Sequence, residues 1–351
     1  MKIALVLAGG VSLGAYQGGA FEAMHGGGLS PDWIAGSSVG AINGAIIAGN
    51  PPDRRLAKLR QFWDRVAQPA FAGSELFSAF VPEKGPVRGW HHLASAVQTR
   101  LFGQPNFFLP TPQAGGIYDL SPLRQLVAEH VDFSVLNRGP IRFSLLTSDI
   151  ETGDPVVFDT ARERIEAEHL IASCGLIGDF PALEIEGRLL GDGGLIANAP
   201  VELVLQEAGT ERLACFVIDL FSRHGPRPAS ALDAGERRSE LIFASQTWQT
   251  IRHYQHLLQV RSSLSEIASH VADPEAARRL HDLGTSAASA LFVLSYCPDP
   301  EEAVMRGFDF SIITLSRRWR RGAAEMHQAL EHFVAHRWPE AQAGLTVFEV
   351  E

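Results

Sequence analysis

The chain has 351 residues, of which 46% are hydrophobic, so it has enough apolar material to bury a large core. Its formal net charge of -10 argues against a general nucleic-acid binder, because neutralising phosphates requires a basic face. Three cysteines are a sparse, odd set, which favours a reducing, cytoplasmic compartment over a disulfide framework. Since no apolar run approaches the roughly 20 residues that span a bilayer, we expect any lipid contact to be peripheral.

The first part of the chain alternates strands and helices. An apolar run at 2–7 is too short for the core of a signal peptide and predicts a buried strand that ends in a glycine turn. A helix is predicted over 15–25, a second strand at 33–36, and further helices over 39–48 and 56–66. This alternation predicts a central, mostly parallel sheet flanked by helices.

Residues 69–116 interrupt the pattern with proline, glycine and aromatic residues. We interpret the segment as a helical insertion whose aromatic side chains belong to the core or form an acyl-chain wall or a lid. The aromatic residues are Phe71, Phe77, Phe80, Trp90, Phe102, Phe107 and Phe108.

Regular structure resumes at Ser121, a helix cap followed by proline at the first helical position. The next predicted elements are strands at 141–147 and 155–158, a helix over 164–173, a hairpin at 183–185 and 189–190, a helix over 201–208 and a buried strand at 213–220.

The last third of the chain is predicted to be a mainly helical extension over 223–351, following a first domain over 1–222. Amphipathic helices are predicted over 236–271, 274–283 and 312–335, with a strand at 290–296 that returns to the sheet. The predicted fold class is therefore α/β, with a helical C-terminal extension.

Residues 36–40, Gly-Ser-Ser-Val-Gly, connect a predicted strand to a predicted helix. This is the G-x-S-x-G pattern of a nucleophile elbow, which exposes the hydroxyl of Ser38 on a strained corner. Gly36 and Gly40 avoid collisions with neighbouring backbone. The helix that follows favours negative charge on an attacking or departing oxygen.

Two further glycine-rich segments complete the candidate site. The turn at 9–14 could place backbone N–H groups beside the elbow as an oxyanion hole, and we predict donors near Gly10 and Val11, with Val39. Asp192, followed by Gly193 and Gly194, could bring its carboxylate to Ser38 as a base. This chemistry requires no metal and no organic cofactor.

In order and approximate spacing, these motifs resemble the patatin-like phospholipase family over roughly residues 3–220. The stretch 172–200, with Phe180-Pro181 and 198–200 (Asn-Ala-Pro), is also similar. The resemblance implies a three-layer α/β/α domain and a Ser-Asp dyad that hydrolyses lipid esters through an acyl-enzyme. It makes Ser38 the nucleophile, Asp192 its base, and the turn at Gly9, Gly10 and Val11 the oxyanion hole.

The chain also departs from the family, which usually has a third glycine and a basic residue where this sequence has Val11 and Leu13. A valine predicts a negative φ in the turn, and a head-group phosphate would need another partner. Residues 309–311 and 317–322 are similar to an extension found in a bacterial subgroup of the family.

Several alternatives stay open at the level of sequence. The same dyad could serve an acyltransferase, and the fold could serve a non-catalytic lipid-binding protein. The glycine turn fails the dinucleotide-binding pattern at Val11. His224 could complete a triad, and His332 with His336 has the spacing of a metal pair or of an exposed helix face. The arginine run 317–321 could contact anionic lipid or form a solvated face.

Overall fold

A mostly parallel sheet of nine strands runs through the part of the chain that the computed structural model describes, residues 1–68, 85–113, 115–207, 211–284, 287–302, 304–336 and 344–350. Its order is β11-β10-β9-β1-β2-β5-β8-β7, with β6 also paired to β5. The strands from β11 to β5 are parallel to their neighbours, whereas β6, β7 and β8 form antiparallel pairs. The strands are β1 Lys2–Leu7, β2 Trp33–Ser37, β5 Arg142–Asp149, β6 Pro155–Asp159, β7 Leu183–Ile185, β8 Arg188–Asp192, β9 Leu213–Asp219, β10 Ala288–Ser295 and β11 Gly344–Val350.

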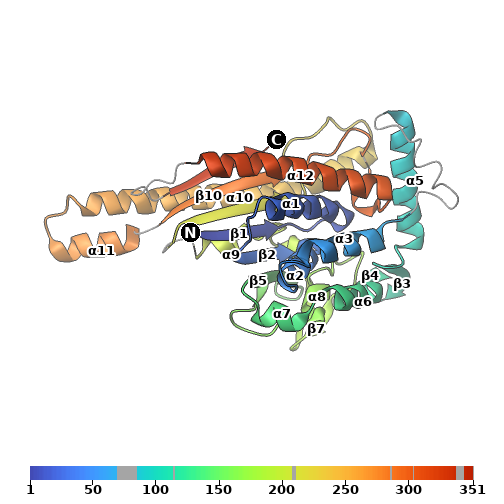
Figure 1. Ribbon diagram of the computed structural model, residues 1–351, viewed down its shortest axis with the longest axis horizontal. Helices are drawn as coiled ribbons and strands as arrows, with labels where there is room; N and C mark the ends of the chain where they lie inside the picture. The colour runs from blue at the N-terminus through green and yellow to red at the C-terminus, as the bar shows by residue number, and fades with distance from the viewer. Residues whose placement is uncertain are drawn as a thin grey trace.

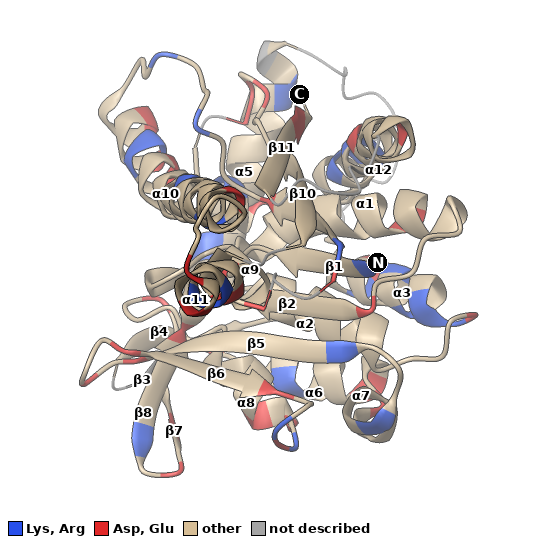
Figure 2. Cartoon of the chain, turned by 90° about the vertical axis from the view of Figure 1, so that its left-hand side faces the viewer, with Lys and Arg blue, Asp and Glu red and all other residues tan. Residues whose placement is uncertain are grey.

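Helices cover both faces of this sheet, which confirms the predicted fold class. Figure 2 shows α1, α3 and α12 on one side and α9 and α10 on the other. The helices are α1 Ala15–Gly26, α2 Val39–Ala48, α3 Arg55–Val66, α5 Pro86–Phe102, α6 Ser121–His130, α7 Phe133–Arg138, α8 Ala167–Ala172, α9 Val201–Leu205, α10 Ala231–Ala268, α11 Pro274–Gly284 and α12 Ile312–Ala335, with short 3-10 turns η1 Val11–Gly14, η2 Gly193–Leu195 and η3 Arg306–Phe308.

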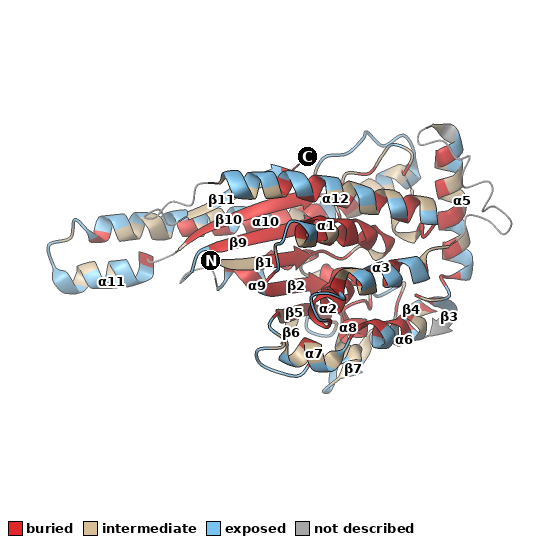
Figure 3. Ribbon diagram, viewed as in Figure 1, coloured by how far each residue is buried: buried red, intermediate tan, exposed pale blue. Residues whose placement is uncertain are grey.

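The central strands are buried because helices lie over both of their faces. Every residue of β2 and β9 is buried, in keeping with their nearly continuous apolar sequences. Figure 3 shows this buried band through the middle of the molecule. The carboxyl ends of β1 and β2 therefore deliver their following turns to one edge of a rigid sheet.

The C-terminal region belongs to the same sheet. The predicted strand at 290–296 is β10, which pairs with β9, and β11 extends the sheet beyond it. Helix α12 crosses α1 so closely that a Cβ at Gly19 would collide with the Trp319 carbonyl. α10 and α11 form a helical hairpin that projects past the end of the sheet (Figure 1).

Some predicted elements differ from the structure. The helix predicted over 164–173 is shortened to α8, while α7, β11 and the small hairpin β3 Leu109–Gln113 with β4 Gly116–Asp119 were not predicted. Within the insertion, Phe71, Phe77 and Phe80 lie outside the described residues. Among the described residues, no helix is both long and apolar enough to cross a membrane.

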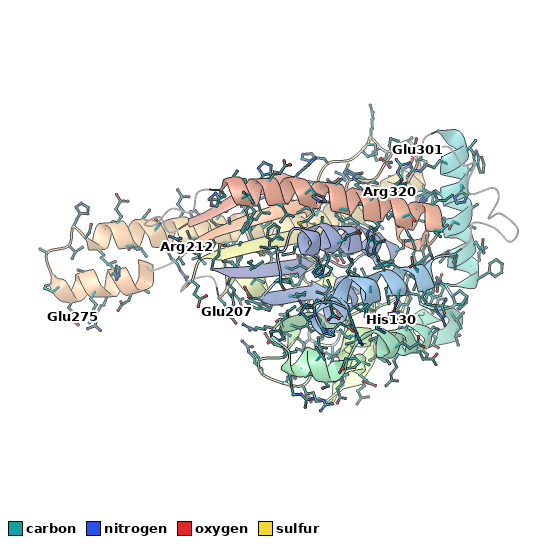
Figure 4. All side chains as sticks on the ribbon, in the orientation of Figure 1. His130, Glu207, Arg212, Glu275, Glu301 and Arg320 are labelled. Carbon is teal, nitrogen blue, oxygen red and sulfur yellow. The ribbon has the colours of Figure 1, made fainter. Side chains whose placement is uncertain are left out.

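The arginine run on α12 is not a solvated face. Arg318 is fully buried and pairs with Glu302, Arg317 pairs with Asp299, and only Arg320 of these three is exposed (Figure 4). The prediction was wrong for Arg318 because helix periodicity does not reveal a carboxylate contributed by a distant loop.

Candidate active site

Ser38 occupies the sharp corner between β2 and α2. Its φ of 53° and ψ of -129° lie outside the helical and extended regions, a strain that costs about 1–3 kcal/mol and persists only where surrounding contacts enforce it. The N–H of Ser38 donates to Ser173 Oγ at 2.9 Å, and the Ser173 hydroxyl donates to the Leu146 carbonyl at 2.7 Å. A side chain at Gly40 would collide with the Leu7 carbonyl, so the elbow requires glycine there.

Asp192 ends β8, which pairs with β5 in the antiparallel part of the sheet. Its Oδ1 accepts the N–H of Gly194 at 2.6 Å, and Asp192 lines the same cavity as Ser38. Burial raises the pKa of Asp192 to about 6, although the neighbouring Ser38 side chain and the Gly194 N–H act in the opposite direction. The cavity that Ser38 lines thus also holds a carboxylate more basic than one in water.

The glycine-rich turn lines the same cavity as Ser38 and Asp192. Of the N–H groups predicted to form the oxyanion hole, one is already hydrogen bonded, and others lie at the starts of helices. The N–H of Gly9 donates to the Asn198 carbonyl at 3.1 Å, so its hydrogen is already committed. Val11 and Val39 are the first residues of η1 and α2, positions where an N–H has no acceptor within the helix. Gly10 precedes Val11 in the same cavity wall.

The predicted negative φ at Val11 is wrong, because the structure gives +50°. The turn keeps a conformation suited to glycine, closed by a hydrogen bond from the Leu13 N–H to the Gly10 carbonyl at 3.0 Å. A left-handed conformation costs a non-glycine residue about 1–2 kcal/mol. A Cβ placed on Gly307 would lie 3.8 Å from the Cβ of Val11, so η3 packs against this strained turn.

An apolar cavity of about 160 Å³ opens over Ser38 and Asp192. One wall comes from the C-terminal region, through α10 and η3, and another from the insertion. The aromatic side chains that line it are Phe107, Phe180, Phe221, Phe243 and Phe308. Such a lining can hold an acyl chain while the polar groups at its base hold the ester.

The cavity also contains a cation that sequence reasoning did not find. Arg306 is buried in the wall, its guanidinium paired with Glu240, and its carbonyl accepts a hydrogen bond from Ser12 Oγ in the glycine-rich turn. Burial lowers the pKa of Arg306 to about 10, so it stays charged at neutral pH. It stands near the turn that carries Leu13 where the resemblance would lead one to expect a basic residue.

Ser173 and Asn198 also support the site without having been assigned to it. Asn198 Nδ2 donates to the Gly9 carbonyl at 3.2 Å, and its own N–H donates to Gln246 Oε1 at 3.0 Å. The stretch 172–200 contains both Ser173 and Asn198, so its similarity to the family was the available signal. Their contacts to the elbow and the turn are visible only in the folded chain.

The alternative histidines lie elsewhere. His224 lines a separate cavity with Trp248 and Cys297, not the one over Ser38. The rings of His332 and His336 pack against Phe348. Within the described ranges, no group of three or more His, Cys, Asp or Glu residues could hold a metal ion.

Two long segments of the chain match models of known protein families. Residues 5–205 match a family model described as patatin-like phospholipase, and residues 241–341 match a second model described as patatin phospholipase. The first match alone covers more than half of the chain and includes Ser38 and Asp192.

Three solved structures are also similar to the chain. VipD from Legionella pneumophila is 11% identical with a TM-score of 0.42, covering 94% of this chain and 66% of that one. The type III effector protein ExoU is 13% identical with a TM-score of 0.35, and the match covers 95% of this chain and 54% of that one. A third structure, of full-length SpcU in complex with full-length ExoU from Pseudomonas aeruginosa, is 15% identical with a TM-score of 0.30. The match covers 78% of this chain and 59% of that one. The chain spans about two thirds of VipD and about half of ExoU.

Proposed function

Because the chain belongs to the patatin-like phospholipase family, we propose that it is a serine acyl hydrolase that cleaves carboxylic esters of lipids through Ser38 and Asp192. The observation that carries the proposal is that Ser38, on its strained corner, and the buried Asp192 carboxyl line the same apolar cavity. No histidine is among the described residues that line this cavity. Asp192 is therefore the proposed base.

The reaction proceeds in two steps. Asp192 takes the proton of Ser38 while the serine oxygen attacks the acyl carbonyl, and the N–H groups of Gly10, Val11 and Val39 stabilise the oxyanion. Asp192 then returns the proton to the departing alcohol, which leaves an acyl group on Ser38. Asp192 then takes a proton from water as the water oxygen attacks this acyl-enzyme, and it returns that proton to the Ser38 oxygen as the fatty acid leaves, which restores the free serine and the ionised Asp192.

The decisive experiment compares Ser38→Ala and Asp192→Asn with matched controls. Activity is measured on acyl esters from p-nitrophenyl butyrate to phospholipids, together with labelling by a fluorophosphonate. We expect Ser38→Ala to lower kcat/KM by about 10⁴-fold or more and to abolish labelling. We expect Asp192→Asn to lower it by about 10²–10⁴-fold.

Two buried residues outside the cavity lining supply the controls. Ser37 is a buried serine adjacent to Ser38 in the chain. Asp219 is a buried carboxyl, and burial raises its pKa to about 7. Neither residue lines the cavity. Ser37→Ala and Asp219→Asn should keep most of the activity. Full activity of the Asp192→Asn variant would rule out the dyad, whereas lipid binding without labelling in the wild type would favour a non-catalytic lipid-binding protein.

Product analysis separates hydrolysis from acyl transfer, because the two share the acyl-enzyme. Release of free fatty acid in the presence of an acceptor alcohol supports the hydrolase. Transfer of most of the acyl group to the alcohol would identify an acyltransferase. Peripheral contact with a lipid surface and a cytoplasmic location belong to the same proposal.

A further inference from the structure

Helix α5 has two faces of opposite character. Val87, Trp90, Val97 and Leu101 are all exposed and follow helical spacing, so they form one strip, which we call the outer stripe. Trp90 is 73% exposed, and Phe102 next to the stripe is 70% exposed. Contiguous large apolar side chains in water mark an interaction site.

The inner face of α5 is fixed by buried polar contacts. Arg88 pairs with Glu302 at 2.8 Å, and His92 Nδ1 lies 2.7 Å from Asp309 Oδ2. Thr99 donates to Gln68 at 3.1 Å. Rotating the helix to bury the outer stripe would break these contacts and expose buried charges, so the stripe faces outward as part of the folded structure.

The outer stripe lies at the end of the molecule that carries the cavity. α5 stands across the end of the molecule toward which the central parallel strands run (Figure 1). Arg100 of this helix pairs with Asp179 at 2.7 Å and lies 4.5 Å from the ring centre of Phe308, and both of these partners line the cavity. Arg100 thus connects α5 to the wall of the cavity.

Further exposed apolar residues continue the surface toward the cavity. Leu109 and Ile117 on the β3–β4 hairpin and Ile177 beside the cavity wall are each more than one third exposed. The Ile117 N–H donates to the Asp179 carbonyl at 3.0 Å, which joins this hairpin to the cavity rim. The apolar surface therefore extends from α5 to the rim.

The composition of the exposed side of α5 suits a phospholipid surface. Residues 86–102 contain no aspartate or glutamate, and their two arginines pair with carboxylates elsewhere, Arg88 with Glu302 and Arg100 with Asp179. Tryptophan, phenylalanine and leucine on one side of a helix are the side chains that enter the head-group region of a bilayer. The outer stripe and Phe102 carry no charged side chain, so docking through them would be driven by burial of apolar area.

We propose that the outer stripe of α5, with Phe102, docks on the surface of a phospholipid bilayer and presents its lipids to the cavity over Ser38. This inference rests on the proposed function, which makes the bilayer lipids substrates. The docking itself does not depend on catalysis, so it can be measured on the Ser38→Ala protein. The two proposals can then fail independently.

The test uses the full chain and vesicles of phosphatidylcholine and phosphatidylglycerol. We expect the double variant Trp90→Ser/Leu101→Ser to lower vesicle co-sedimentation by about tenfold or more, because it removes two large apolar side chains from the contact. Hydrolysis of vesicle lipid should fall in parallel, while kcat/KM for p-nitrophenyl butyrate should stay within about twofold, because neither residue lines the cavity. Val334→Ser, at an 82% exposed site on α12, is the matched control and should bind vesicles like the wild type.

Three outcomes would overturn the docking proposal. The first is unchanged vesicle binding by the double variant. The second is an equal loss with Val334→Ser. The third is a wild-type protein that does not co-sediment with vesicles but self-associates in analytical ultracentrifugation, in a way that the Trp90 substitution abolishes. That result would make the stripe a protein interface. Loss of hydrolysis in all proteins with intact, stripe-dependent vesicle binding would instead count against the proposed function alone.

Discussion

At the scale of single residues, the candidate site depends on how burial changes one carboxylate. Asp192 is withdrawn from water, so its pKa rises to about 6, and an ionised Asp192 is a better base than an exposed aspartate. The same withdrawal makes its ionised form costly to the fold. A basic group and a stability cost at one position are typical of an active site.

The raised pKa predicts a pH profile. The proposed base must be ionised, so kcat/KM for p-nitrophenyl butyrate should increase about tenfold per pH unit below pH 6 and level off above it. A pH–rate profile of the wild type tests this expectation. A flat profile down to about pH 4 would show that no group with the raised pKa of Asp192 limits the reaction.

Asp219→Asn is the control for this profile. The raised folded pKa of Asp219 means that the folded state binds the proton more tightly than the unfolded chain. Its stabilising contribution is therefore present below about pH 4 and is lost as pH increases through 7. Near pH 8 the free energy of unfolding of the asparagine variant, measured in urea, should exceed that of the wild type by up to roughly 4 kcal/mol. Its pH–rate profile should keep the inflection near pH 6. Movement of the inflection would assign it to Asp219.

At the scale of secondary-structure elements, α12 connects distant parts of the chain to the glycine-rich turn. Arg318 donates to Ser12 Oγ at 2.8 Å and to the Arg306 carbonyl at 2.9 Å, and it pairs with Glu302 at 3.3 Å. One buried guanidinium thus joins η1, η3 and the loop before η3. The strained conformation at Val11 is held against this framework.

Replacing Arg318 should therefore destabilise the whole protein. Arg318→Leu leaves Glu302 buried without this partner, and we expect the free energy of unfolding to fall by about 3–5 kcal/mol in urea titration. Arg320→Leu, on the exposed side of the same helix, should change it by no more than about 0.5 kcal/mol. Equal effects of the two substitutions would contradict the structural role of Arg318.

At the scale of the whole molecule, the C-terminal region takes part in the sheet, the α1 side of the fold and the cavity. β10 covers the edge of β9, α12 packs along α1, and Phe243 and Phe308 line the cavity. Without these residues, β9 would become an apolar edge strand, which is a site for aggregation. The family match at 5–205 therefore does not include every residue around the site.

A chain that ends at residue 222 tests this dependence. We expect it to aggregate or to unfold without a cooperative transition, and to lose esterase activity, because it lacks β10, α12 and one cavity wall. Circular dichroism during thermal unfolding and the p-nitrophenyl butyrate assay provide the measurements. A cooperatively folded, fully active fragment would show that 1–222 is an independent domain.

The sequence alone determined the features that depend on neighbours in the chain. The order of strands and helices and the elbow around Ser38 follow from hydrophobic spacing and from glycines within a few residues of each other. The order of elements and the elbow are confirmed because local sterics and periodicity leave few alternatives. The pairing of Ser38 with Asp192 was inferred from motif order, and it stays a prediction, although both residues line one cavity.

Only the tertiary structure decided the features that depend on distant contacts. Burial of Arg318 requires Glu302, the cavity wall requires Arg306 and Phe308, and the positive φ of Val11 is held by packing from η3. β11 becomes a strand because β10 offers it an edge. No pattern within these segments encodes such partners, because the free energy that selects each conformation comes from residues far away in the chain.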